Sequence, residues 1–182
     1  MASAVVVALA ALLALTPLIF HEVGHWVALR RLDVEVKEYW LGLGPAVLKW
    51  GRLRVGLLPI GGAVVPDPLP YAALTHKERM QVALAGPAAS LLYGVIALLV
   101  FYGSVGLQGV QGLKSIAMLN FLLAAVNLVP IPPLDGFQAL SSWMEHRKTP
   151  FSNSTLNITA RLGNGLVYGV GFFVLGMTLI RH

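Results

Sequence analysis

The chain has 182 residues, of which 57% are hydrophobic and only 12% charged, and it contains no cysteine. Soluble domains carry about twice that share of charged residues, so the composition indicates an integral membrane protein. The absence of cysteine excludes disulfides and thiolate metal ligands. The net charge of +5 does not indicate nucleic-acid binding, because the basic residues lie in loops beside apolar segments, where membrane topology and anionic lipid headgroups account for them.

Four apolar stretches are near the roughly 17 to 25 residues that a helix needs to cross a bilayer. They cover about residues 4–30, 82–102, 113–129 and 162–180. We therefore predict an α-helical integral membrane protein with about four transmembrane helices, forming a single membrane-embedded domain over residues 1–182. Eleven lysines and arginines flank one side of these spans and two flank the other, which places the N-terminus outside and the two basic loops in the cytoplasm.

The first apolar stretch runs directly into the motif His21-Glu22-Val23-Gly24-His25. Charged side chains cost roughly 2.5 to 3.5 kcal/mol each in a bilayer centre, so three ionisable residues within five indicate a functional site. Because residues i and i+4 share a helix face, His21 and His25 can both direct a ring nitrogen at one zinc ion, and Glu22 can act on the metal's water. The alternative is a pair of interfacial histidines beside a snorkelling glutamate.

Between the first two spans, residues 46–50 and 52–58 form partly alternating runs joined at Gly51, which predict a short membrane-associated β-hairpin. Residues 59–62, which include Gly61 and Gly62, predict a sharp turn after it. An exposed edge of this hairpin could bind an extended peptide by adding a strand, or the hairpin could close the membrane face of the protein. The sequence leaves both interpretations open.

The second span has a clear predicted start, because Thr75 and Glu78 fit a capping box. Within the span, the segment 86–90 combines Pro87 with small residues, including Gly86 and Ser90. Proline can kink a helix and small residues allow two helices to approach closely. We expect this segment to serve helix packing.

A third metal ligand is expected, because catalytic zinc sites commonly have three protein ligands and one open position. The third span ends in a proline-rich segment, 127–136, that carries Asp135 into an otherwise apolar setting. Irregular backbone at membrane depth is tolerated where protein or a watery cavity surrounds it. The predicted topology places Asp135 and the two histidines toward the same side of the membrane. Asp135 is therefore the candidate third ligand, against the simpler interpretation of a helix-terminal carboxylate.

The motif at 21–25 and the run Asn-x-x-Pro-x-x-Pro-Leu-Asp-Gly at 127–136 together resemble the site-2 protease family of intramembrane zinc metalloproteases. Segments 42–45, 59–62 and 86–87 extend this resemblance over most of the chain. It implies one zinc ion per chain, held by His21, His25 and Asp135, with Glu22 as the catalytic base. It also suggests that Asn127 holds substrate backbone near the metal.

The sequence departs from many relatives in having Ser90 where they have asparagine, and the loops leave no room for the PDZ or CBS domains that others carry, which suggests a minimal catalytic core. The resemblance implies an endopeptidase that cleaves in or near a transmembrane segment of a membrane protein such as a tethered regulator, with a regulatory membrane partner possible and the oligomeric state open. Gly61 and Gly62 are expected to line a polar passage from the cytoplasmic side and to contact substrate. The alternative is a membrane zinc carrier or scaffold without catalysis.

Overall fold

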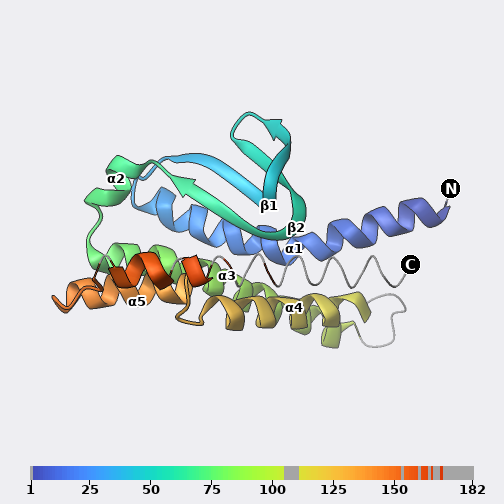
Figure 1. Cartoon of the computed structure of the whole chain (residues 1–182). Helices are drawn as coiled ribbons and strands as arrows, with labels where there is room; N and C mark the ends of the chain where they lie inside the picture. Colours follow the sequence, from blue (N-terminus) through green and yellow to red (C-terminus); the bar gives the residue numbers. More distant parts are fainter. Residues whose placement is uncertain are drawn as a thin grey trace.

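The computed structural model describes residues 2–104, 111–152, 154–159, 161–163, 165 and 169, with side chains from residue 15 onward except at 43, 58–60 and 111. Figure 1 shows a small sheet on one side of the first helix and further helices on the other side. The elements are α1 (Ala2–Arg31), β1 (Val36–Trp50), β2 (Leu53–Pro66), α2 (Pro68–Ala73), α3 (His76–Gly103), α4 (Gln111–Asn127) and α5 (Asp135–His146).

Helix α1 forms over the first predicted span and places the motif at 21–25 in its second half. Its 30 residues extend for about 45 Å at 1.5 Å per residue. Beyond Arg31 the chain turns, and Leu29 packs in a buried apolar cluster with Val34, Val36 and Val82. This cluster joins the end of α1 to the start of β1 and the first turns of α3, so it fixes the helices that surround the motif.

The hairpin between the first two helices is confirmed, but its strands are longer than predicted. The strands pair antiparallel with several register shifts, so that residues 39–41 have partners at both 53–55 and 62–64. The predicted turn at 59–62 is wrong, because these residues continue β2. Gly61 has a φ of +72°, and this left-handed conformation bends the strand where its pairing moves from one part of β1 to another.

Helix α3 contacts α1, α4 and α5 and is the centre of the helical layer. It begins as predicted, because the Thr75 side chain accepts a hydrogen bond from the Glu78 backbone and the Glu78 carboxylate accepts one from the Thr75 backbone at 2.7 Å. Where α1 crosses α3, a Cβ at Gly24 would meet the Ala85 carbonyl and lie 2.7 Å from the Ala89 Cβ. The predicted close helix approach is therefore present at this crossing.

Helix α3 is also, within the described part of the chain, the one helix that passes a length and hydropathy test for crossing a membrane. Helix α4 is apolar but has 17 residues and ends at Asn127. The fourth predicted span, 162–180, lies almost entirely outside the described residues. The structure therefore supports a small sheet packed on apolar helices, and the number of four spans stays a prediction.

Helix α5 was not expected from the sequence, which placed Asp135 at the broken end of the third span. The chain leaves α4 at Asn127, passes through a turn at 128–134 and starts a new 12-residue helix at Asp135. A Cβ at Gly136 would collide with the Leu128 carbonyl, so the turn closes tightly onto the start of α5. Asp135 consequently occupies the N-terminal turn of a helix that packs on α3.

Candidate metal centre

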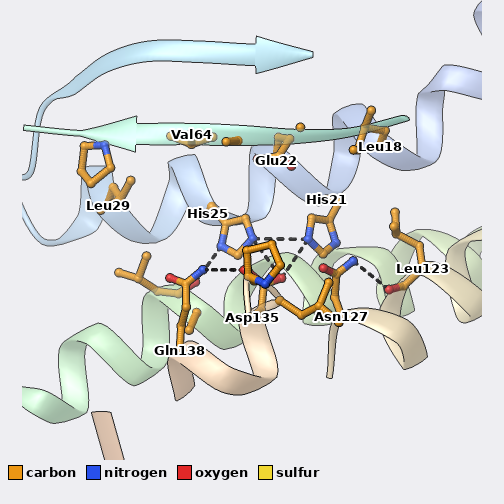
Figure 2. Close-up of a pocket in the computed structure, with 18 of the residues that line it drawn as sticks. Leu18, His21, Glu22, His25, Leu29, Val64, Leu123, Asn127, Asp135 and Gln138 are labelled. Carbon is orange, nitrogen blue, oxygen red and sulfur yellow. Dashed lines mark hydrogen bonds and ion pairs between the residues drawn. The ribbon is translucent and has the colours of Figure 1, made fainter. Parts of the chain in front are cut away.

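His21, His25 and Asp135 meet where α1, α3 and α5 come together. The Asp135 Oδ2 atom lies 3.0 Å from His21 Nε2 and 3.3 Å from His25 Nε2, and the two Nε2 atoms are 3.3 Å apart. Figure 2 shows both rings directed from α1 toward the aspartate. His21 and Asp135 are buried, and His25 is half-buried. Two histidine nitrogens from successive turns of α1 and one carboxylate oxygen from the start of α5 thus form a compact triangle.

The second ring nitrogen of each histidine also has a partner. His25 Nδ1–H donates to the Val82 carbonyl at 2.8 Å, which leaves its Nε2 lone pair directed at the triangle. His21 Nδ1 lies 2.9 Å from the buried Ser90 hydroxyl oxygen. Partners of this kind fix the orientation and tautomer of imidazoles that bind metals. Both supporting groups come from α3.

The chemistry and spacing of these donors fit a zinc ion. Tetrahedral zinc with bonds of about 2.0 to 2.1 Å to nitrogen and oxygen requires its ligand atoms to be about 3.3 Å apart. The three observed separations are 3.0 to 3.3 Å. Two imidazoles and one carboxylate leave the fourth tetrahedral position for a water molecule or a substrate, as in catalytic zinc sites. Asp135 also lies in the first turn of α5, where the helix dipole favours a negative charge.

Glu22 lies next to the triangle, on the side of α1 that faces β2 (Figure 2). A Cβ at Gly62 would be 2.9 Å from the Glu22 Oε1 atom, so glycine gives the carboxylate space beside the strand. The backbone of Val64 lies within hydrogen-bonding reach of the same carboxylate. The carboxylate is therefore held between the helix that carries the histidines and strand β2.

A cavity of about 530 Å³ opens at the triangle and reaches from α1 to β2, α2, α4 and α5. It includes the residues predicted to contact substrate, because Asn127, Gly61 and Gly62 all line it. The Asn127 amide donates to the Leu123 carbonyl at 3.0 Å, which orients its side chain at the end of α4. Residues 61–64 of β2 line this cavity, whereas the 46–58 hairpin, which we considered for peptide capture, does not.

Two α3 residues contribute to the site in a way that sequence reasoning missed. We assigned the segment 86–90 to packing, yet Ser90 contacts His21, and a Cβ at Gly86 would collide with the His25 ring and lie 2.8 Å from His21 Nε2. The signal available in the sequence was the small-residue pattern itself, which does not reveal that the facing atoms are imidazole nitrogens. Glycine at this position is required by the histidines as well as by helix packing.

An ion-pair cluster at the other end of α5 joins that helix to the start of α3. The Glu145 carboxylate accepts a hydrogen bond from Arg79 Nη2 at 2.7 Å and lies 3.1 Å from His76 Nδ1. Tyr71 of α2 lines the cavity nearby, and burial raises the pKa of its hydroxyl, so it remains a neutral hydrogen-bond donor over the physiological range. The cluster holds α5 against α3 at the end opposite Asp135.

Comparison with known proteins points in the same direction as the geometry. The model of peptidase family M50 matches residues 8–115 and 105–170. A zinc metalloprotease of Methanocaldococcus jannaschii is 26% identical over 164 residues, covering 89% of this chain and 42% of that protein. Rip2 of Mycobacterium tuberculosis is 30% identical over 190 aligned positions, covering 92% of this chain and 73% of that protein.

The chain is also similar to a named bacterial protease and to a protein of solved structure. The regulator of sigma-E protease RseP of Escherichia coli is 28% identical over 142 residues, covering 65% of this chain and 30% of that protein. The structure of a site-2 protease from Methanocaldococcus jannaschii matches with a TM-score of 0.58 and 26% identity, over 93% of this chain and 68% of that chain. The chain thus spans less than half the length of the archaeal zinc metalloprotease and of RseP.

Proposed function

The chain belongs to peptidase family M50, and on this premise we propose that it is a zinc-dependent endopeptidase that cleaves a membrane protein in or near a transmembrane segment. The observation that carries this proposal is the triangle of His21, His25 and Asp135 with the Glu22 carboxylate beside it. A site that only stored or carried zinc would gain nothing from a carboxylate placed next to the ligands. The adjoining cavity provides space for an extended peptide.

In this proposal His21, His25 and Asp135 hold one zinc ion per chain. Zinc bound there would act as a Lewis acid that polarises a carbonyl and lowers the pKa of water to about 7. The Glu22 carboxylate takes a proton from water as the water oxygen bonds to the substrate carbonyl carbon. Glu22 then passes this proton to the amide nitrogen, and the carbon–nitrogen bond breaks to release the amine. Ser90 and the Val82 carbonyl hold the two imidazoles in place while this happens.

Substrate binding in this proposal uses main-chain groups. A substrate segment lies extended along residues 61–64 of β2, which line the cavity, and adds a strand there. The Asn127 amide at the end of α4 holds the substrate backbone from the opposite wall. A helical substrate has to unwind to bind, because the hydrogen bonds and neighbouring side chains of a helix shield its peptide bonds.

The proposed setting is the cell membrane, with about four spans, the N-terminus outside and the metal centre toward the cytoplasmic side. The distribution of basic residues supports this orientation. The apolar helix α3 and the many exposed large apolar side chains on α3 and α4 suit contact with lipid. The substrate is then a membrane-spanning protein, such as a tethered regulator, and a regulatory membrane partner would control its access.

The test is cleavage of a helical membrane substrate by the purified wild type and by Glu22→Gln in the same detergent. We expect Glu22→Gln to lower the cleavage rate by at least about 100-fold, because a positioned general base contributes roughly that much or more. The variant should keep its zinc, measured by metal analysis, since Glu22 is not assigned as a ligand. Equal cleavage by both proteins would contradict the proposed peptidase activity and leave the alternative of a zinc carrier or scaffold.

A further inference from the structure

Ser90 is a buried hydroxyl group at the metal centre that the proposed reaction does not use directly. It lies in the middle of α3 with none of its surface exposed, and its oxygen is 2.9 Å from His21 Nδ1. It does not line the cavity, so substrate does not reach it. Its contact with the metal centre therefore runs through the histidine alone.

The position of Ser90 follows from the way in which α3 packs against α1. On α1 the two histidines are four residues apart, and on α3 the groups that support them, Val82 and Ser90, are eight residues apart with Gly86 between them. Residues spaced by four lie on one helix face. One stripe of α3 therefore offers a carbonyl to His25, space for both rings at Gly86, and a hydroxyl to His21.

The two supports differ in chemical kind. The Val82 carbonyl belongs to the backbone, so a side-chain substitution leaves it in place. The hydroxyl of Ser90 is a side-chain group, and a serine oxygen can accept a hydrogen bond while its own proton is donated elsewhere. If His21 binds metal through Nε2, its proton resides on Nδ1 and points at this oxygen. Ser90 can then accept this proton in a hydrogen bond and so support the tautomer that leaves Nε2 free.

We propose that Ser90 is a positioning residue, whose hydroxyl accepts a hydrogen bond from His21 Nδ1–H and so sets the affinity of the site for zinc. The inference rests on the proposed zinc site but not on peptide cleavage. Removal of an equivalent supporting group in other metal sites typically weakens metal binding by about 10- to 100-fold.

The experiment compares Ser90→Ala with the matched control Ser142→Ala. Both serines are buried, and Ser142 lies on α5, two turns from Asp135, with no role assigned at the metal centre. The dissociation constant for zinc is measured on each full-length protein in detergent by competition with a chromophoric chelator. We expect Ser90→Ala to weaken zinc binding by about 10- to 100-fold and Ser142→Ala by less than about threefold.

Two further readouts separate positioning from a merely structural effect. Zinc-free Ser90→Ala should still unfold in one cooperative transition with only a small loss of thermal stability, because one lost buried hydrogen bond weakens the fold without opening it. In the zinc-loaded wild type, nitrogen NMR of labelled histidine should place the His21 proton on Nδ1. Zinc affinity of Ser90→Ala within about threefold of wild type, or ligation of zinc through His21 Nδ1, would overturn the proposal.

These measurements need no substrate, so their outcome is independent of the Glu22→Gln comparison. A protein that bound zinc through Ser90-supported His21 but cleaved nothing would contradict the proposed function and leave this inference standing. Conversely, a protein that cleaved substrate with unchanged zinc affinity in Ser90→Ala would contradict only the inference.

Discussion

Helix α3 makes two close contacts through glycine, and we expect the two contacts to respond differently to an added methyl group. At Gly86 the facing groups are the imidazoles of His21 and His25, and at Gly94 the facing group is the Phe121 ring of α4. The imidazoles are tied to Ser90, Val82 and Asp135 by hydrogen bonds, whereas the phenyl ring packs against an apolar cluster, which leaves it free of such directional partners. On the side of α3 that faces the histidines, which we call the metal side, hydrogen bonds fix the positions of the side chains. On the side that faces α4, only the packing of apolar side chains does so.

Buried polar groups show the same contrast. At the metal centre each buried polar side chain contacts a group on another helix. On the α4 side, the fully buried Asn120 donates to the Ile116 carbonyl of its own helix, and its Oδ1 atom has no hydrogen-bond partner in the described part of the chain. Polar groups thus join the helices on one side of α3 and stay within a helix on the other.

The largest effect that this comparison predicts is that of Gly86→Ala on metal binding. The new methyl group would displace the His25 ring, and overpacking of this kind typically costs about 1 to 3 kcal/mol. We expect zinc affinity to fall by about 10- to 100-fold, at 1.4 kcal/mol for each factor of ten. The measurement is chelator competition, with circular dichroism to show that the helices remain. Unchanged zinc affinity would show that the imidazoles are not held as described.

A smaller effect, confined to stability, is expected for Gly94→Ala. A Cβ at this position would lie 2.7 Å from the Phe121 Cε1 atom, so the ring has to swing away. Overpacking costs about 1 to 3 kcal/mol, and exchange of glycine for alanine within a helix returns about 1 kcal/mol, so the net loss should be at most about 2 kcal/mol. Thermal unfolding in detergent measures it. Zinc affinity should not change, and a tenfold loss would remove the distinction between the two sides of α3.

The smallest effect is expected for Glu145→Gln. This variant tests whether the metal side extends along α5 to the end opposite Asp135. The ion pair with Arg79 is about a quarter to a third exposed, so solvent screens it, and its loss should cost no more than about 1 kcal/mol. Unfolding measurements at low and high salt should show that this cost shrinks as salt rises. If zinc affinity fell by more than tenfold, the far end of α5 would have to be counted as part of the metal centre.

Features that depend on neighbouring residues could be predicted from the sequence. The capping box at Thr75 and Glu78 was predicted because both hydrogen bonds join residues three apart, and it is confirmed. The motif at 21–25 was placed on a helix with both histidines on one face for the same reason. Asp135 was predicted as a ligand from its chemistry and the topology, since few other possible ligands lie on the same side of the membrane as the histidines. The structure brings it to the histidines.

The remaining features depend on how distant segments meet. Ser90 and His21 are 69 residues apart, and their contact depends on the rotation and register of α3 against α1, which no local pattern specifies. The turn predicted at 59–62 was wrong because β2 runs through these residues and pairs with β1 at Leu58 and again at Gly62. Helix α5 was missed because the proline-rich segment before it was interpreted as the end of a span rather than as a linker between two helices.

The distance of 114 positions between His21 and Asp135 has a consequence for biosynthesis. Both histidines and Glu22 enter the nascent chain early, while the last donor is added some 6 to 23 seconds later at about 5 to 20 residues per second. Until that residue has been translated and its helix has docked, no complete set of donors exists. A shorter nascent chain therefore carries only part of the donor set, and the complete set forms once α5 has docked on α3.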